Sequence, residues 1–309
     1  MPVVTKRSLS AAGKLQGIIP PLITPLKARD QLDHGGLERL LEHVINGGVS
    51  GVFVLGTTGE GPALNYSLRR ELIQRVCRQT SGRVPVLVGI TDTSYVEALA
   101  IARYAADYGV HSVVASAPYY MPPDQDELAQ YMEQLARELP LPLFLYNIPP
   151  MTKVVFQPAT LKRLSGLQNI IGVKDSSGDM NYFRRVVALK KQRPDWSVLV
   201  GWEHQLVEAT HLGGDGGVNA GANYDPQLFV DLYEALRNGD IKKEKKLQQR
   251  VLLLGKVYRV GHSAAGVVQG LKCACAQKRF CREILAAPFV PLVAPERKKV
   301  IKILRQLRT

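Results

Sequence analysis

The sequence lacks the long apolar runs, the internal repeats and the glycine motifs that mark several classes of protein. No apolar run reaches the roughly 20 residues that a transmembrane helix needs, so we expect no membrane-spanning segment. No strand-like run is followed by Gly-x-Gly-x-x-Gly, which argues against a two-domain dinucleotide-binding fold. No linker rich in proline, glycine or serine divides the chain, so we expect no second domain.

Cysteine is scarce, and its spacing argues against a metal centre. The four cysteines are Cys77, Cys273, Cys275 and Cys281. Cys-x-Cys is not the usual spacing of zinc ligands, and no histidine follows closely. We therefore predict no metal site and interpret these cysteines as reduced, small apolar residues of a cytoplasmic protein.

Acidic residues are also few, with 27 against 40 lysines and arginines, and the net charge is +13. Such a charge would suit an anionic partner. The basic residues are spread out, however, and their densest run, 296–305, has the pattern of an amphipathic terminal helix with a solvated basic face. Because no zinc-finger or RNP-like motif is present, we do not expect a nucleic-acid partner. The first sixteen residues contain no acid and no Arg-rich amphipathic pattern, so we predict a flexible leader over 1–16.

Eight short apolar runs have the composition of strands that are buried on both faces of a parallel sheet. They are 17–24, 50–56, 84–90, 112–117, 141–147, 170–174, 196–201 and 216–220. Helical patterns separate them at 35–46, 67–80, 94–108, 126–138, 158–164, 182–192 and 204–212. This alternation predicts an α/β protein with a single (β/α)8 TIM barrel over residues 17–225. Later helical patterns at 226–237, 241–258, 264–276 and the tail predict additional C-terminal helices, with residues 226–309 forming an extension packed on the barrel.

Lys174 ends the sixth run abruptly, before the small polar residues of a turn. In a barrel, residues at the carboxyl ends of the strands form the site. An ammonium group among apolar neighbours is costly, and an amine without its extra proton can attack a carbonyl carbon and form a Schiff base. The alternative is a lysine that ends a strand and extends to solvent.

Three other strand ends carry hydroxyl groups or free backbone N–H groups. The sequence GTTG at 56–59 is a tight turn that would suit a carboxylate, PYY at 118–120 places two phenols in a stiff loop, and Tyr146 ends the run beside that of Lys174. Their structural alternatives are a simple turn, packing aromatics and a core tyrosine with a bonded hydroxyl. Together they predict a site for a 2-oxo acid, in which a tyrosine moves protons.

The combination of GTTGE at 56–60, PYY at 118–120, YNIP at 146–149 and GVKD at 172–175 resembles the dihydrodipicolinate synthase and N-acetylneuraminate lyase family. The resemblance covers about residues 17 to 291. It implies a class I, pyruvate-dependent aldolase or lyase that forms a covalent imine between pyruvate and a lysine and needs no cofactor or metal. It also implies a 2-oxo acid and an aldehyde as substrates, and a homodimer or homotetramer.

The resemblance assigns a role to each motif residue. Lys174 would form the imine and Tyr146 would carry protons. Thr57 would link Tyr146 to a tyrosine of the neighbouring subunit, which Tyr120 matches. Thr58 would hold the pyruvate carboxylate with its backbone N–H. Four further positions match or adjoin substrate-binding positions, namely Gly201, Glu203, Val218 and Asn219.

Two departures from the family pattern bear on the substrate. The lysine-biosynthesis members carry an arginine that clamps aspartate semialdehyde two residues after YNxP, but Met151 stands there in this chain. Lys153 is either a replacement charge or a solvent-facing residue. Glu203 matches an acid that binds sugar hydroxyls in the sialic-acid lyases; the alternative is an acid at a helix N-terminus.

We therefore predict a Schiff-base lyase that condenses or cleaves pyruvate-derived 2-oxo acids of the 2-keto-3-deoxy sugar acid type. One alternative is 4-hydroxy-tetrahydrodipicolinate synthase with a substituted arginine clamp. Dehydration of a keto-deoxy acid through the same imine is another. The alternative of a different class is a non-catalytic binding or regulatory barrel.

Overall fold

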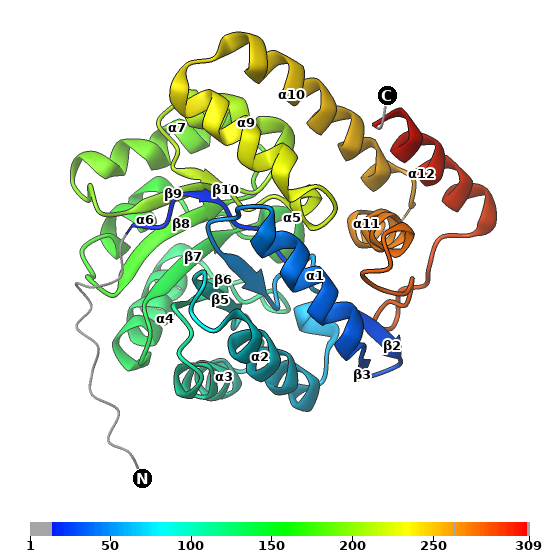
Figure 1. Ribbon diagram of the computed structural model, residues 1–309. Helices are drawn as coiled ribbons and strands as arrows, with labels where there is room; N and C mark the ends of the chain where they lie inside the picture. The colour runs from blue at the N-terminus through cyan, green and yellow to red at the C-terminus, as the bar shows by residue number, and fades with distance from the viewer. Residues whose placement is uncertain (1–13, 263, 308–309) are drawn as a thin grey trace.

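The computed structural model describes residues 14–262 and 264–307. Within them, eight parallel strands form one sheet in the order β1-β10-β9-β8-β7-β6-β5-β4. Their bounds are β1 (Gly17–Ile18), β4 (Val52–Val54), β5 (Val86–Gly89), β6 (Ser112–Ser116), β7 (Leu143–Asn147), β8 (Ile170–Asp175), β9 (Ser197–Val200) and β10 (Gly216–Gly217). The first and last strands of this order meet at a parallel bridge between Pro21 and Phe53, where Leu22 N donates to Phe53 O at 2.8 Å. The sheet closes into the predicted barrel (Figure 1).

The helices follow the predicted alternation and cover the outside of the barrel (Figure 1). They are α1 (His34–Asn46), α2 (Tyr66–Thr80), α3 (Tyr95–Asp107), α4 (Gln125–Glu138), α5 (Pro149–Thr152), α6 (Pro158–Leu164), α7 (Met180–Ala188), α8 (Leu206–His211), α9 (Pro226–Asn238), α10 (Ile241–Gly255), α11 (Gly266–Gln277) and α12 (Ala294–Gln306). The short α5 and an antiparallel hairpin of β2 (Leu26–Ala28) and β3 (Gln31–Leu32) were not predicted. No helix in the described ranges is both long and apolar enough to cross a membrane.

Local sequence sets several of the helix ends. Asp124 and Glu127 form a capping box at the start of α4, in which each side chain accepts a backbone N–H of the other residue. Asp225 caps α9, and the proline that follows it begins the helix without needing a backbone donor. Gly239 ends α9 with φ of 69°, a left-handed conformation that glycine adopts at little cost.

Alternate residues of the strands face two separate clusters. The inward-facing set fills the barrel and includes Phe53, Leu87, Val114, Phe144 and Leu199. The strand residues between them, such as Val52, Val54, Val86, Val88 and Val113, pack outward under the helices. The barrel interior is therefore a packed apolar layer, and a site is left at the carboxyl ends of its strands.

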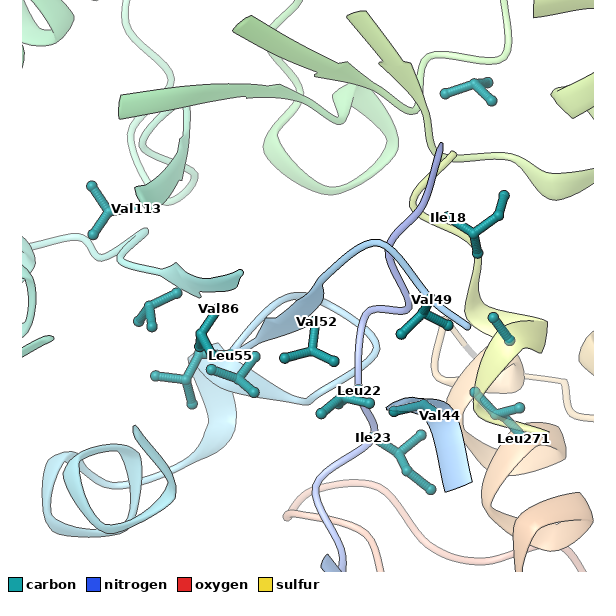
Figure 2. Close-up of a cluster of buried hydrophobic side chains, with 14 of the residues drawn as sticks. Ile18, Leu22, Ile23, Val44, Val49, Val52, Leu55, Val86, Val113 and Leu271 are labelled. Carbon is teal, nitrogen blue, oxygen red and sulfur yellow. The ribbon is translucent and has the colours of Figure 1, made fainter. Parts of the chain in front are cut away.

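The C-terminal helices pack against this barrel. In Figure 1, α10 lies over α9, and α11 and α12 lie to the side of α1. Leu271 of α11 joins the outward-facing cluster that contains Ile23 and Val44 (Figure 2). The boundary after residue 225 stays a prediction. It falls between a 3-10 turn at Ala220–Asn223 and α9, which is the next α-helix after β10.

The leader predicted over 1–16 lies largely outside the described residues, which begin at Lys14. Lys14 Nζ pairs with Asp215 Oδ1 at 2.8 Å, and Leu15 is buried in the cluster inside the barrel.

Candidate active site

Neighbouring strands place Lys174 and Tyr146 side by side. The two residues are partners in the register of β7 and β8, close to the carboxyl end of each strand. Lys174 Nζ lies 3.9 Å from the centroid of the Tyr146 ring and 5.1 Å from that of Phe53. Lys174 is only 5% exposed, so it does not extend to solvent as the alternative interpretation required.

An apolar layer lies beneath this pair. On the other side of β8, Lys174 pairs in register with Leu199 of β9. Leu199, Phe53, Tyr146 and Val218 belong to the one cluster inside the barrel, and each is buried. The amine is thus held against a packed apolar layer at the end of its strand.

A polar network ties the ends of β7 and β8 together beside the lysine. Asn147 Nδ2 donates to Asp175 Oδ1 at 2.8 Å, and Asn147 Oδ1 accepts from Phe156 N at 3.1 Å. Ser177 donates its backbone N–H to Asp175 Oδ1 and its hydroxyl to Asp175 Oδ2. Burial raises the pKa of Asp175, and the bonds from Asn147 and Ser177 oppose that rise. These residues fix the strand ends on which Lys174 and Tyr146 stand.

Sequence reasoning assigned no role to Asn147 or Asp175, although both belong to the YNIP and GVKD motifs. The sequence could have indicated a role for both, because each directly follows a proposed catalytic residue at the end of a strand.

The loop after β4 carries Thr57 and Thr58 in a tightly built turn. Gly61 N donates to Gly56 O at 3.1 Å, and Thr24 Oγ1 donates to Gly59 O at 2.7 Å. Thr58 is 9% exposed, whereas Thr57 is exposed. A Cβ on Gly61 would lie 2.1 Å from Leu55 O, so the backbone here approaches itself too closely for any side chain.

The loop after β6 presents Tyr120 away from the body of the barrel. Tyr120 is 84% exposed and its neighbour Met121 is 80% exposed. The described chain therefore does not bring Tyr120 into a buried group with Lys174 and Tyr146. Met151, at the position of the missing arginine, is 43% exposed on α5, and Lys153 Nζ donates to Pro150 O at 3.0 Å.

The strand ends across the barrel supply the remaining predicted residues. Val218 lines the interior cluster, and Asn219, which follows it, is fully buried. Neither side-chain polar atom of Asn219 has a hydrogen-bond partner among the described residues. A Cβ on Gly201 would lie 1.9 Å from Ser176 Oγ, so a larger residue here would have to displace that side chain.

Glu203 is buried in a different environment. It begins a 3-10 turn after β9, and its Oε2 accepts from Gly221 N at 2.8 Å. Burial raises the pKa of Glu203 to about 7, and the hydrogen bond from Gly221 N opposes that rise. The carboxylate faces the segment after β10 and the C-terminal helices, so the structure does not group it with Lys174. Its contact with sugar hydroxyls stays a prediction.

The comparisons with known proteins agree with this geometry. The model of the dihydrodipicolinate synthetase family matches residues 14–307. The chain belongs to this family. The family resemblance and the barrel predicted from the sequence are thereby confirmed, and the class predicted, a lyase, is that of the named aldolase relatives.

Three relatives illustrate the range of the family. The chain is 48% identical to a dihydrodipicolinate synthase of Bacteroides thetaiotaomicron, whose structure matches with a TM-score of 0.91 over 94% of this chain and 98% of that one. The Escherichia coli protein YagE, a putative 2-dehydro-3-deoxy-D-gluconate aldolase, is 32% identical over 94% of this chain and 97% of its own. Its structure in complex with pyruvate matches with a TM-score of 0.90. The probable 2-dehydro-3-deoxy-D-pentonate aldolase YjhH of Escherichia coli is 36% identical over 79% of this chain and 82% of its own.

Proposed function

We propose that this protein is a Schiff-base lyase that cleaves or forms 2-keto-3-deoxy sugar acids, with pyruvate as the common product or substrate. The observation that carries the proposal is the buried Lys174, 3.9 Å from the Tyr146 ring centroid at the carboxyl ends of two paired strands. An amine and a phenol in this arrangement provide the nucleophile and the proton carrier of such chemistry.

The reaction follows from these positions. The Lys174 amine attacks the keto carbon, and loss of water leaves an imine. In the cleavage direction, the bond between C3 and C4 breaks, the electron pair moves into the imine to form an enamine, and the C4 hydroxyl becomes an aldehyde. Tyr146 takes up the proton of that hydroxyl and returns a proton to C3. Hydrolysis of the imine then releases pyruvate and the free lysine.

The other predicted residues hold the substrate in this proposal. The backbone N–H of Thr58 binds the carboxylate, and Thr57 passes protons between Tyr146 and a second copy of the chain. Gly201, Val218 and Asn219 line the position of the departing aldehyde, and the unpartnered amide of Asn219 suits a sugar hydroxyl. The imine itself serves as the electron sink, so no metal or cofactor takes part.

The assembly is part of the same proposal. Tyr120 is 84% exposed on the described chain, and a neighbouring subunit would bury it beside the partner's Tyr146 and Thr57. We therefore propose a homodimer or homotetramer, acting in the cytoplasm on small-molecule substrates. One similar structure is that of a monomeric dihydrodipicolinate synthase variant, so the oligomeric state of this chain has to be measured.

Met151 supports a sugar acid over aspartate semialdehyde, because a thioether offers no charge to a second carboxylate. The second candidate is 4-hydroxy-tetrahydrodipicolinate synthase, which the 48% identity to the Bacteroides enzyme favours. The two are separated by assaying pyruvate release from five- and six-carbon 2-keto-3-deoxy acids and condensation of pyruvate with aspartate semialdehyde. We expect kcat/KM to be higher for a keto-deoxy acid, and Met151→Arg to shift the preference toward the semialdehyde. A wild-type enzyme that prefers the semialdehyde would establish the second candidate.

A further inference from the structure

A buried ion pair connects the loop after β4 to the C-terminal helices. Glu60 Oε2 pairs with Lys272 Nζ of α11, and the two side chains are 3% and 0% exposed. Glu60 Oε1 accepts from Ala286 N at 2.7 Å, and Lys272 Nζ donates to Ile284 O at 2.7 Å. The loop after β4 is therefore joined by one polar network to α11 and to the segment that follows α11.

Glu60 stands in the same turn as Thr57 and Thr58. Its backbone is left-handed, with φ of 57° and ψ of 24°, and Glu60 N donates to Thr57 O at 3.0 Å. A glutamate rarely adopts this conformation, and it persists only where the surrounding structure imposes it. The pairing with Lys272 holds the side chain on the α11 side of the loop, and this fixes the turn that carries Thr57 and Thr58.

The surroundings leave the pair little freedom to rearrange. Leu271, the residue before Lys272, packs in the apolar cluster with Ile23 and Val44 (Figure 2), and Thr24 bonds to Gly59 in the same loop. Burial lowers the pKa of Lys272, and Glu60 opposes that shift, so the positive charge of Lys272 depends on its partner. Apolar residues can often replace a buried ion pair without loss of stability. We therefore attribute to the Glu60–Lys272 pair a role in fixing geometry more than in stabilising the fold.

We propose that Glu60 and Lys272 are positioning residues that orient the Thr57–Thr58 turn for the carboxylate of pyruvate. The C-terminal helices then form part of the substrate-binding apparatus through α11. The inference rests on the proposed function, because it assigns the turn to pyruvate. It adds a long-range determinant of pyruvate affinity that lies outside the residues touching the substrate.

The test uses three variants of the full-length chain, namely Glu60→Gln, Lys272→Met and the double variant Glu60→Gln/Lys272→Met. For each, pyruvate is titrated, the imine is trapped with borohydride, and the adduct at Lys174 is quantified by mass spectrometry. Thermal unfolding is measured in parallel. We expect both single variants to melt at lower temperature, because each leaves a buried charge unpaired, and the double variant to recover most of this loss.

The two readouts separate positioning from stability. We expect the double variant to need about tenfold to a hundredfold more pyruvate for half-maximal trapping, because misplacing a binding group costs affinity even in a stable fold. Lys190→Met is the matched control. It breaks a pair with Asp215 at the amino end of β10, on the far side of the barrel from the strand ends that carry the site, and should leave the pyruvate titration unchanged.

Each outcome has a distinct meaning. A double variant with recovered melting temperature and a wild-type pyruvate titration would show that the pair is only structural, and would overturn the proposal. If both single variants gave the same pyruvate titration as the wild-type protein, the proposal would be overturned as well. If the wild-type protein itself traps no pyruvate, the proposed function fails first, and the positioning role is lost with it.

Discussion

Replacing Glu203 by glutamine should make the stability of this barrel less dependent on pH. Glu203 is buried, and burial raises its pKa from 4.5 to about 7. The folded protein therefore binds the proton more tightly than the unfolded chain does. By linkage, the contribution of Glu203 to the free energy of unfolding is largest below pH 4.5. It falls as the pH rises from 4.5 to 7 and is constant above that range.

The size of the effect follows from the shift. A change of one pKa unit corresponds to about 1.4 kcal/mol, so a rise from 4.5 to about 7 corresponds to a loss of about 3 kcal/mol by neutral pH. Glutamine does not titrate, and its side-chain oxygen can still accept the Gly221 N–H. We expect Glu203→Gln to gain about 2–3 kcal/mol in unfolding free energy relative to wild type between pH 5 and pH 8.

Urea denaturation at several pH values, followed by circular dichroism, measures this difference. Glu208→Gln, an exposed acid on α8, serves as the matched control for the loss of one negative charge. The reasoning would be refuted if the difference between wild type and Glu203→Gln stayed constant, within about 0.5 kcal/mol, from pH 5 to pH 8.

Two further substitutions test the site and the barrel. Tyr146→Phe should lower kcat about 10²- to 10⁴-fold, because it removes the proton carrier, while borohydride still traps pyruvate on Lys174; steady-state rates and intact mass would show this, and an unchanged kcat would contradict it. Gly172→Ala should lower the free energy of unfolding by about 1–3 kcal/mol, because its Cβ would lie 2.2 Å from Ser197 O in the next strand. Thermal unfolding measures that loss, and a wild-type melting temperature would show that the strands can separate without cost.

The barrel could be predicted from the sequence because its strands are buried on both faces. Each such strand is a continuous apolar run, and the alternation with helices repeats along the whole chain. The hairpin of β2 and β3 was missed because its strands are only two or three residues long and contain polar residues. Strands this short carry too little periodicity to stand out from a loop.

The candidate site also has one part that the sequence predicts and another that it does not. Lys174 and Tyr146 lie at the ends of neighbouring strands, so their proximity follows from the fold. The environment of Glu60 could not be predicted, because its partner lies on α11, far along the chain. The environment of Glu203 depends on how the turn after β10 folds back onto it. Packing of α11 against the loop after β4 decides the Glu60 contact, and no local pattern encodes it.

The most direct test of the account is reduction of the protein with borohydride in the presence of pyruvate, followed by mass spectrometry of the intact chain and its peptides. We predict one adduct of pyruvate, located on Lys174 and absent from Lys174→Ala. A folded protein that gives no adduct, under conditions that trap pyruvate on a known family member, would contradict the lyase assignment and leave a binding or regulatory barrel as the account to pursue.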